Sequence, residues 1–405
     1  MRVLLVHNRY QIAGGEDSVV AQELAMLNAS GMNVELFEVN NDSITSPFAR
    51  IVTAAQVAYS WNMRARINRV LTKMRPEIVH VHNFFPQISP SVYDAAADAG
   101  CSVVQTLHNY RLLCPSATLY RQGSICHECL EKKTPWPGVL HACYRSSRIG
   151  TASVAAMIAW NRFRGTWANK VHRYIVLTEF AKTLFTQYSD IPERKLCIKQ
   201  NAIADPGLGS GRGAYALYVG RLSPEKGISV LLEAASMGLG LPLKVAGAGP
   251  LEGLAREAHA AGHIEYLGRL DAEAIRSLMQ EAAVLLVPSL WYEGLPMVIP
   301  EAFGTGLPVI ASKIGSLASL ISDGYNGLLV PPADAEAIRA AILRIAVSSE
   351  LQASLRRGAR LTYDARYEPQ QNVVSLQQIY QQALDERCQA NLNSKTRSDC
   401  QIVQP

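Results

Sequence analysis

The feature that most constrains the fold of this chain is an apolar run that leads directly into a helix start. Ala282 to Pro288 has the continuous apolar character of a buried parallel strand. Helix-compatible sequence follows from Met297 to Phe303 and ends at Gly304 and Gly306. The stretch therefore predicts a parallel strand whose carboxyl end turns into a helix.

Two carboxylates, Glu293 and Glu301, lie on this strand-to-helix turn with seven residues between them. If those residues were fully helical, the two side chains would lie roughly 12 Å apart along the axis. Carboxyl groups that share one proton or flank one glycosidic bond lie closer, at roughly 5 to 10 Å. The wider spacing suits two groups that hold opposite ends of an elongated ligand, with the helix N-terminus between them to receive a negative charge. A nucleotide sugar has this shape.

Three further motifs accompany this stretch in a fixed order. They are Val219-Gly-Arg-Leu-Ser-Pro-Glu-Lys-Gly227, Val245-Ala-Gly-Ala-Gly-Pro250 and Gly324-Tyr-Asn-Gly-Leu-Leu-Val-Pro-Pro332. Together with the Glu-x7-Glu pattern they resemble the retaining glycosyltransferases of family 4, over nearly the whole chain to about Leu384. The resemblance implies an α/β protein of the GT-B fold, in which two Rossmann-like, doubly wound parallel-sheet domains face a cleft.

The length of 405 residues favours two domains, because the chain is too long for one ordinary core. We predict an N-terminal, acceptor-side Rossmann-like domain over residues 1–205, which carries a Cys-rich insertion at 114–143. A C-terminal nucleotide-sugar-binding domain is predicted over 206–366, and the glycine-rich stretch from Asp205 to Gly213 at its start is the predicted interdomain linker. In GT-B enzymes a last helix returns to the first domain, and we assign it to 367–387. Residues 388–405 are polar and aperiodic, which predicts a disordered tail.

The resemblance also implies roles for residues of the second domain. In such families Glu301 binds the ribose hydroxyls and Glu293 binds the hydroxyls of the sugar. Arg221 and Lys226 hold the diphosphate and counter the charge that grows on the leaving group. Backbone N–H groups at the helix start assist them, namely those of Gly294, Leu295, Met297 and Val298.

Two strand ends of the first domain are predicted to face the same ligand. A first strand leads into Gly14 and Gly15, where the backbone allows a close approach. The family loop lies near the transferred sugar, so Gly15 joins the predicted donor site. In the family a histidine at a later strand end contacts the donor sugar near the reaction centre. We carry this role to His108, which with Glu293 forms the predicted catalytic pair.

Two other histidines, His80 and His82, occur at the end of a neighbouring strand. Ligand-binding residues gather at the carboxyl ends of strands in open parallel sheets. A lone histidine is also commonly a satisfied core or loop residue. The sequence leaves both interpretations open.

Four cysteines, Cys114, Cys126, Cys129 and Cys143, lie in the insertion. Four thiolates are the number for a tetrahedral structural zinc site, although the spacing is less regular than two Cys-x2-Cys knuckles. Ordinary buried thiols are the alternative. Such a zinc would have no open coordination position and would not be catalytic. We expect no catalytic metal, because no Asp-x-Asp motif occurs.

The net charge of the chain is unevenly distributed. Residues 1–200 hold 22 Lys and Arg against 14 Asp and Glu, whereas the remainder holds 17 against 20. A basic first half indicates an anionic partner or simply solvated surface charges. We expect a sugar or lipid-linked glycan acceptor, peripheral contact with a membrane and no nucleic acid. No apolar run is long enough to span a bilayer and no signal peptide is evident, so we expect a cytoplasmic protein. The family resemblance and the basic first half together imply that it acts at the inner face of the membrane.

The expected function is that of a hexosyltransferase-class enzyme in polysaccharide biosynthesis, for capsule, exopolysaccharide or O-antigen. It would transfer a sugar from a nucleotide diphosphate sugar to an acceptor hydroxyl with retention of configuration. A nucleotide-sugar hydrolase or epimerase and a non-catalytic nucleotide-sugar-binding protein are the alternatives. A nicotinamide oxidoreductase is disfavoured, because the turn at Gly247 and Gly249 lacks the third glycine of that fingerprint.

Overall fold

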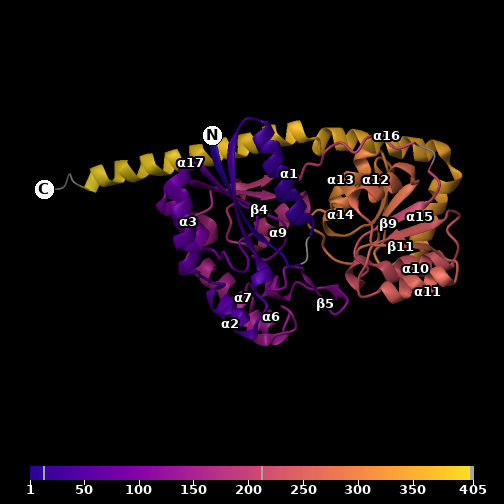
Figure 1. Cartoon of the computed structure of the whole chain (residues 1–405), viewed down its shortest axis with the longest axis horizontal. Helices are drawn as coiled ribbons and strands as arrows, with labels where there is room; N and C mark the ends of the chain where they lie inside the picture. Colours follow the sequence, from indigo (N-terminus) through magenta and orange to yellow (C-terminus); the bar gives the residue numbers. More distant parts are fainter. Residues whose placement is uncertain (12–13, 211–212, 402–405) are drawn as a thin grey trace.

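The computed structural model describes residues 1–11, 14–210 and 213–401, with side chains as far as residue 389. Two six-stranded sheets with helices around them form two domains that lie side by side (Figure 1). The first sheet uses strands between residues 2 and 198, and the second uses strands between residues 216 and 330. The predicted α/β architecture of two parallel-sheet domains is confirmed.

The first sheet has the strand order β2-β1-β3-β4-β7-β8, and every pair in it is parallel. The order reverses between β1 and β3, which is where ligands bind in open α/β sheets. Its strands are β1 (Arg2–Arg9), β2 (Asn33–Asn40), β3 (Ile78–Val81), β4 (Ser102–Leu107), β7 (Arg173–Val176) and β8 (Leu196–Ile198).

The second sheet has the order β11-β10-β9-β12-β13-β14 and is also fully parallel. This order reverses between β9 and β12, so the loops after these two strands border the second switch point. Its strands are β9 (Ala216–Val219), β10 (Leu243–Ala246), β11 (Glu265–Gly268), β12 (Val284–Val287), β13 (Val309–Ser312) and β14 (Gly327–Val330).

Helices cover both faces of each sheet. Those of the first domain are α1 (Gly15–Ala29), α2 (Pro47–Gln56), α3 (Trp61–Met74), α4 (Ser91–Asp98), α7 (Arg148–Phe163), α8 (Thr166–Asn169) and α9 (Glu179–Tyr188). Those of the second are α10 (Ile228–Ser236), α11 (Glu252–Ala260), α12 (Ala272–Glu281), α13 (Val298–Gly304), α14 (Gly315–Leu320), α15 (Ala335–Val347) and α16 (Ser349–Arg366). The insertion forms a small lobe of β5 (Tyr120–Arg121), β6 (Ser124–Ile125), α5 (Glu128–Glu131) and α6 (Trp136–Leu140).

Strand β1 shows how the first sheet is buried on both faces. Leu4 and Val6 belong to one apolar cluster, which includes Ile67 of α3. Val3 and Leu5, which point the other way, belong to a second cluster. Because both faces of β1 are covered, its sequence is a continuous apolar run and not an alternating one.

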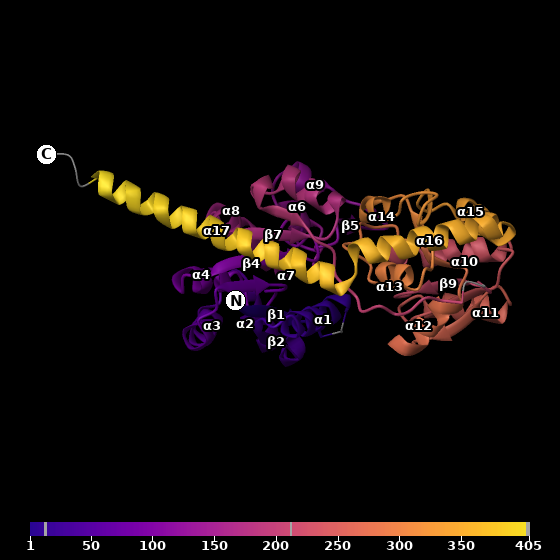
Figure 2. The same ribbon diagram turned by 90° about the horizontal axis from the view of Figure 1, so that it is seen from above.

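The last helix, α17 (Pro369–Gln401), crosses from the second domain back over the first (Figure 2). There Leu376 and Tyr380 belong to one apolar cluster with side chains of β1, β3, β4 and β7. We predicted a helix over 367–387 and disorder from 388. That prediction was wrong as far as residue 401, because the helix continues to Gln401. The segment contains no glycine or proline that would end it, and glutamine, alanine, lysine and arginine favour helix. Residues 402–405 of the predicted tail lie outside the described residues.

The predicted linker is held against the second domain. The backbone N–H of Gly209 donates to the carbonyl of Thr305, and that of Ser210 donates to the carbonyl of Gln280. A Cβ atom at Gly209 would lie 2.2 Å from the Gln280 carbonyl oxygen. The glycine at this position therefore permits a close backbone contact.

Candidate active site

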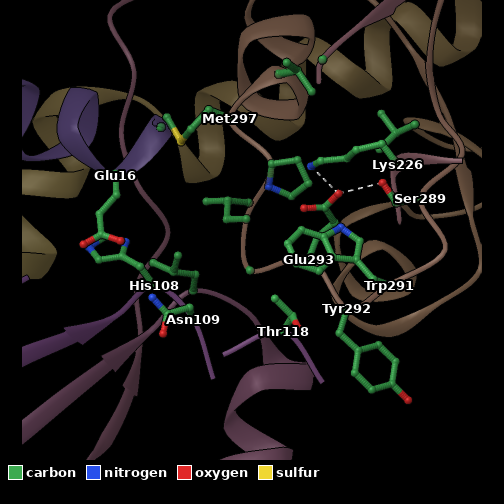
Figure 3. Close-up of a pocket in the computed structure, with 18 of the residues that line it drawn as sticks. Glu16, His108, Asn109, Thr118, Lys226, Ser289, Trp291, Tyr292, Glu293 and Met297 are labelled. Carbon is green, nitrogen blue, oxygen red and sulfur yellow. Dashed lines mark hydrogen bonds and ion pairs between the residues drawn. The ribbon is translucent and has the colours of Figure 1, made fainter. Parts of the chain in front are cut away.

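A cavity of about 570 Å³ lies between the two domains. Its size is that of a ligand site, and its lining comes from the loops after β1, β4, β9 and β12, where both strand orders place a binding crevice. We call the lining residues from Tyr10 to Asn201 the first-domain wall and those from Tyr218 to Glu301 the second-domain wall. Figure 3 shows the two walls facing each other across the cavity, with His108 on one side and Glu293 on the other.

Most of the predicted site residues line this cavity. The lining includes Gly15, His108, Lys226, Glu293, Gly294, Leu295, Met297, Val298 and Glu301. Arg221 lies outside it, with an exposed side chain. The carbonyl of Arg221 accepts a hydrogen bond from the Tyr218 hydroxyl at 2.9 Å, which holds the backbone of the loop. The structure thus brings Lys226 into the cavity and leaves its neighbouring cation at the surface.

Glu293 is the central charged group of the second-domain wall. Its side chain is 6% exposed, and its Oε1 atom lies 2.7 Å from the Lys226 ammonium nitrogen. The same oxygen accepts a hydrogen bond from the Ser289 hydroxyl at 2.7 Å. Both interactions converge on one oxygen, and the other oxygen carries no dashed line in Figure 3. The Glu-x7-Glu motif does not include Ser289. The signal that could have identified this residue is its position directly after Pro288, at the carboxyl end of the predicted strand.

Glu301 has a different environment. Burial raises the pKa of this carboxyl to about 7, with a smaller opposing effect from Arg276. No described side chain or backbone group makes a hydrogen bond to its oxygens. Helix α13 begins at Val298, so the backbone from Glu293 to Met297 is not helical. The helix predicted from Met297 to Phe303 is thus found within one residue of its predicted bounds. The spacing of roughly 12 Å, which holds only for a fully helical segment, does not apply, because a turn containing Pro296 separates the two carboxylates.

The turn that carries these carboxylates touches the first domain. A Cβ atom at Gly294 would lie 2.5 Å from the carbonyl oxygen of His108, so a larger residue would not fit without movement. The Tyr110 hydroxyl donates to the carbonyl of Glu293 at 3.1 Å. The ring of Tyr292 packs between Phe180, at 4.6 Å between centroids, and His127, at 5.5 Å. These contacts join the two walls at one loop.

His108 and Glu16 are two of the ionisable groups on the first-domain wall. His108 is partly buried, and burial, reinforced by His82, holds the pKa of its imidazole well below the ordinary value. Glu16 lies on the same wall, where burial and then Asp17 raise the pKa of its carboxyl to about 8. Glu16 was not among the predicted site residues, because nothing in the Gly-Gly turn distinguishes it from an ordinary helix-start carboxylate.

The structure decides between the two interpretations of His80 and His82. Both side chains are buried and hydrogen bonded, His80 to Thr106 at 2.8 Å and His82 to Glu23 at 3.0 Å. Neither lines the main cavity. They are satisfied core residues.

The four insertion cysteines line one small cavity of about 20 Å³. Cys126 directly follows β6 and Cys129 lies in the first turn of α5, so the Cys-x2-Cys pair spans a strand-to-helix turn. All four are free thiols, and burial followed by Cys114 raises the pKa of Cys129 to about 12. Within the described residues, the group whose ligand atoms all lie within 4.8 Å of one another is Glu23, His80 and His82, not the cysteines. The donor set has the chemistry that zinc prefers, but no three of these four sulfur atoms all lie within 4.8 Å of one another.

A protein-family model matches the part of the chain that carries the second-domain wall. Residues 203–362, less than half of the chain, match the model of the glycosyl transferases group 1. An uncharacterized glycosyltransferase of Methanocaldococcus jannaschii is 29% identical over 42% of this chain and 49% of its own length. A phosphatidyl-myo-inositol mannosyltransferase of Mycolicibacterium smegmatis is 33% identical over 35% of this chain and 38% of its own length. An O-antigen chain mannosyltransferase B of Escherichia coli is 34% identical over 32% of this chain and 36% of its own length. The chain spans about half or less of the length of these relatives.

Solved structures resemble the chain over nearly its whole length. Sucrose-phosphate synthase of Thermosynechococcus elongatus matches with a TM-score of 0.70 at 19% identity, covering 95% of this chain and 99% of that one. Anabaena HepE in complex with UDP matches with a TM-score of 0.65 at 16% identity, covering 94% and 99%. At these identities the likeness shows the fold. The chain therefore has the GT-B fold, and its residues 203–362 carry the sequence pattern of the glycosyl transferases group 1.

Proposed function

We propose that this protein transfers a sugar from a nucleotide diphosphate sugar to an acceptor hydroxyl. The observation that carries the proposal is the interdomain cavity, in which Glu293, Lys226 and Glu301 lie on one wall and His108 on the other. The match of residues 203–362 and the UDP bound to the similarly folded Anabaena protein support it.

In this proposal each group of the second-domain wall binds one part of the donor. Glu301, which has no hydrogen-bond partner among the described residues, accepts hydrogen bonds from the ribose hydroxyls. Glu293 accepts from the sugar hydroxyls through its unoccupied oxygen, while Lys226 faces the diphosphate. Backbone N–H groups in the turn add donors for the phosphates. Arg221 joins them when its side chain turns inward as the loop meets the ligand.

Retention of configuration is part of the proposal and follows from the family resemblance. The acceptor hydroxyl oxygen forms a bond to the anomeric carbon on the face from which the bond to the phosphate breaks. The departing phosphate oxygen takes the hydroxyl proton, so no other base is required. Lys226 stabilises the charge that the phosphate gains. We propose no catalytic metal.

Two other functions remain candidates on the same cavity. A nucleotide-sugar hydrolase or epimerase would form product from the donor alone, at a rate that no acceptor changes. A non-catalytic binding protein would bind the donor without turnover. Release of nucleotide that depends on an added acceptor separates the transferase from both.

We further propose that the acceptor is a sugar or lipid-linked glycan of a surface polysaccharide, met at an anionic membrane surface. No helix in the described part of the chain is both long and apolar enough to cross a bilayer. The first domain instead exposes large apolar side chains on α2, α3 and α7: Phe48 is 76% exposed, Ile51 68%, Trp61 70% and Phe163 84%. Arg50, Arg66 and Arg69 are exposed on the same helices. This combination suits a monotopic contact with the inner leaflet of the cytoplasmic membrane.

Vesicle flotation tests the membrane contact. Vesicles with anionic lipid should carry the protein upward, and neutral vesicles should carry much less. The double substitution Phe48→Ser and Ile51→Ser should abolish flotation. Val347→Ser removes a side chain that is 82% exposed on the second domain and should leave flotation unchanged. Equal flotation of all variants would argue against this face.

We also propose a structural zinc ion on Cys114, Cys126, Cys129 and Cys143. Its support is the convergence of four free thiols on one cavity in a lobe with few buried apolar residues. Metal analysis of the purified protein should find one zinc per chain. Cys129→Ser should remove it, whereas Cys101→Ser, at a buried thiol outside the lobe, should not.

The experiment that tests the central proposal is calorimetric titration of the full chain with a panel of nucleotides and nucleotide sugars. One diphosphate sugar should bind, and Lys226→Ala should weaken it at least tenfold. Arg221→Ala, on the same loop, tests whether the exposed cation joins the site: it weakens binding only if the side chain turns inward. Absence of binding across the panel would contradict the proposed function.

A further inference from the structure

A line of three polar side chains connects the interior of the first domain to the cavity. It begins at Glu23 of α1, whose Oε1 atom lies 3.0 Å from the Nε2 atom of His82. The Nδ1 atom of His82 lies 3.0 Å from the Nε2 atom of His108. The two imidazole planes differ by 20°, with centroids 5.3 Å apart, so the rings lie nearly edge to edge along this hydrogen bond.

Glu23 is an anion at the buried end of the line. Its side chain is 4% exposed, and the Lys199 ammonium lies 3.3 Å from its second oxygen. Burial by itself would raise the pKa of Glu23, but Lys199, His82 and His80 together hold it well below its usual value. An ionised carboxylate has no proton to donate, so it can only accept hydrogen bonds.

This property fixes the direction of each hydrogen bond along the line. His82 must carry its proton on Nε2, which faces Glu23. Burial lowers the pKa of His82 to about 4 despite the nearby carboxylate, so its other nitrogen, Nδ1, is an unprotonated acceptor at neutral pH. The Nε2 atom of His108 must then be the donor. His108 is also neutral, which leaves its Nδ1 without a proton and with no hydrogen-bond partner among the described residues.

A metal ion at the inner end of the line is a competing interpretation. Ligand atoms of Glu23, His80 and His82 all lie within 4.8 Å of one another. The ammonium of Lys199 already neutralises the same carboxylate, and a cation beside it would be repelled. His80 is also occupied, by Thr106 at 2.8 Å and Tyr380 at 2.9 Å. The cluster is satisfied without a metal.

We propose that Glu23 and His82 are positioning residues that fix the tautomer of His108, so that His108 presents Nδ1 to the cavity as a hydrogen-bond acceptor. The tautomer follows from the buried hydrogen bonds together with the negative charge of Glu23, which Lys199 stabilises, and the neutral state of the two imidazoles. The identity of the ligand group that meets Nδ1 rests on the proposed function.

The consequence is a rule for what His108 can bind. A bare imidazole nitrogen accepts from a hydroxyl group and offers nothing to a phosphate oxygen, which has no proton to give at neutral pH. His108 therefore faces a hydroxyl of the sugar or of the acceptor, and the diphosphate lies by Lys226 on the opposite wall. A donor analogue that lacks this hydroxyl should lose turnover while its nucleotide part still binds.

Nitrogen-15 NMR of the full chain labelled at histidine tests the tautomer directly. His108→Gln and His82→Gln identify the two signals among the nine histidines. At pH 7 both residues should show protonated Nε2 and bare Nδ1. Protonated Nδ1 on His108, or an imidazolium, would overturn the proposal. This measurement needs no substrate, so it stands even if no nucleotide sugar binds.

A pair of substitutions tests the positioning. In Glu23→Gln the new amide can donate, so the line can reverse and place a proton on His108 Nδ1. We expect the spectrum to show a mixture of the two neutral tautomers of His108. We expect kcat to be at least tenfold lower, and the affinity for nucleotide to stay within twofold of that of the parent protein. Tyr380→Phe removes a hydroxyl that bonds to His80 at 2.9 Å and that makes no hydrogen bond to Glu23, His82 or His108 among the described residues, although His80 itself lies 3.1 Å from Glu23. It should leave the tautomer and kcat unchanged.

An unchanged His108 tautomer in folded Glu23→Gln would contradict the positioning role. If Glu23→Gln does not fold, because Lys199 is left unpaired in the interior, the parent spectrum still decides the tautomer. Loss of nucleotide binding in the parent protein would instead contradict the proposed function, and the two failures are therefore distinguishable.

Discussion

The two walls of the cavity are built differently. The second-domain wall takes most of its polar groups from one continuous segment, in which Ser289, Glu293 and Glu301 lie within thirteen residues. The first-domain wall depends on residues that are far apart in the chain. His108 is held by His82, which is held by Glu23, whose charge is balanced by Lys199.

The second-domain wall is a local sequence motif, whereas the first-domain wall is formed by residues that only the folded domain brings together. A strand-to-helix turn brings its own side chains together, so its chemistry follows from local spacing. The buried line to His108 exists only when α1, β3, β4 and the segment after β8 have packed into one domain. Substitutions in the second-domain wall should therefore change function with little effect on stability, and substitutions in the first-domain line should change both.

The largest effect is expected for Glu293→Gln. The amide keeps the size of the side chain but removes the charge that pairs with Lys226 and accepts from the sugar. We expect kcat to fall about 100-fold or more, because loss of one polar group that acts on the transition state costs roughly this much. The melting temperature should stay within a few degrees, as the comparison of the two walls requires.

Ser289→Ala is the matched control for that substitution. It removes one neutral hydrogen bond to the same Glu293 oxygen. Such a bond contributes about 1 kcal/mol, which corresponds to roughly fivefold in rate. Near-normal kcat in Glu293→Gln, or an equal loss in both variants, would show that the carboxylate charge is not central.

The next effect is an acid response with opposite signs at two buried groups, His82 in the first domain and Glu301 in the second. The pKa of His82 is about 4 in the folded protein, against an ordinary value of 6.5. The unfolded chain therefore binds the proton first, and stability is lost as pH falls through this window, by up to about 1.4 kcal/mol per pKa unit. Glu301 has a folded pKa of about 7 against 4.5, so its contribution is lost as pH rises through 7.

Hydrogen exchange resolved by peptide distinguishes the two responses. After correction for intrinsic rates, peptides of β3 and β4 should lose protection between pH 7 and pH 5. Peptides of β12 and α13 should keep or gain it. Equal loss of protection in both domains would remove the proposed contrast between the walls.

The same contrast explains what the sequence could predict. Apolar runs identified the strands, and the Glu-x7-Glu segment contains more than half of the second-domain wall, because each signal lies within about a dozen residues. Glu23 and Lys199 look like surface charges in the sequence, and only the packed domain shows that they neutralise each other. Arg221 shows a different limit of the sequence: its motif is local, but the motif does not say which way an exposed side chain points.

A smaller effect is expected for donor affinity as a function of pH. Only ionised Glu301 accepts from both ribose hydroxyls, and its pKa is about 7 in the free protein. Affinity for a nucleotide diphosphate sugar should therefore weaken below pH 7, by up to about tenfold per pH unit. Calorimetry at pH 6, 7 and 8 measures this. Glu301→Gln should bind weakly with no pH dependence over the range, and a parent protein with constant affinity would exclude Glu301 from ribose binding.

The smallest effect is expected at the contact between the walls. Tyr110→Phe removes the hydrogen bond from the Tyr110 hydroxyl to the Glu293 carbonyl, at a cost of about 1 kcal/mol. Tyr215→Phe is the matched control, because the Tyr215 hydroxyl also donates to a backbone carbonyl, that of Leu278, but within the second domain. Urea denaturation should show similar losses of stability. If the loop of Glu293 is positioned from the first domain, only Tyr110→Phe should also lower kcat, by a few fold. Equal kcat in both variants would mean that the turn holds its own geometry, and the second-domain wall would then be a self-contained unit that the first domain only covers.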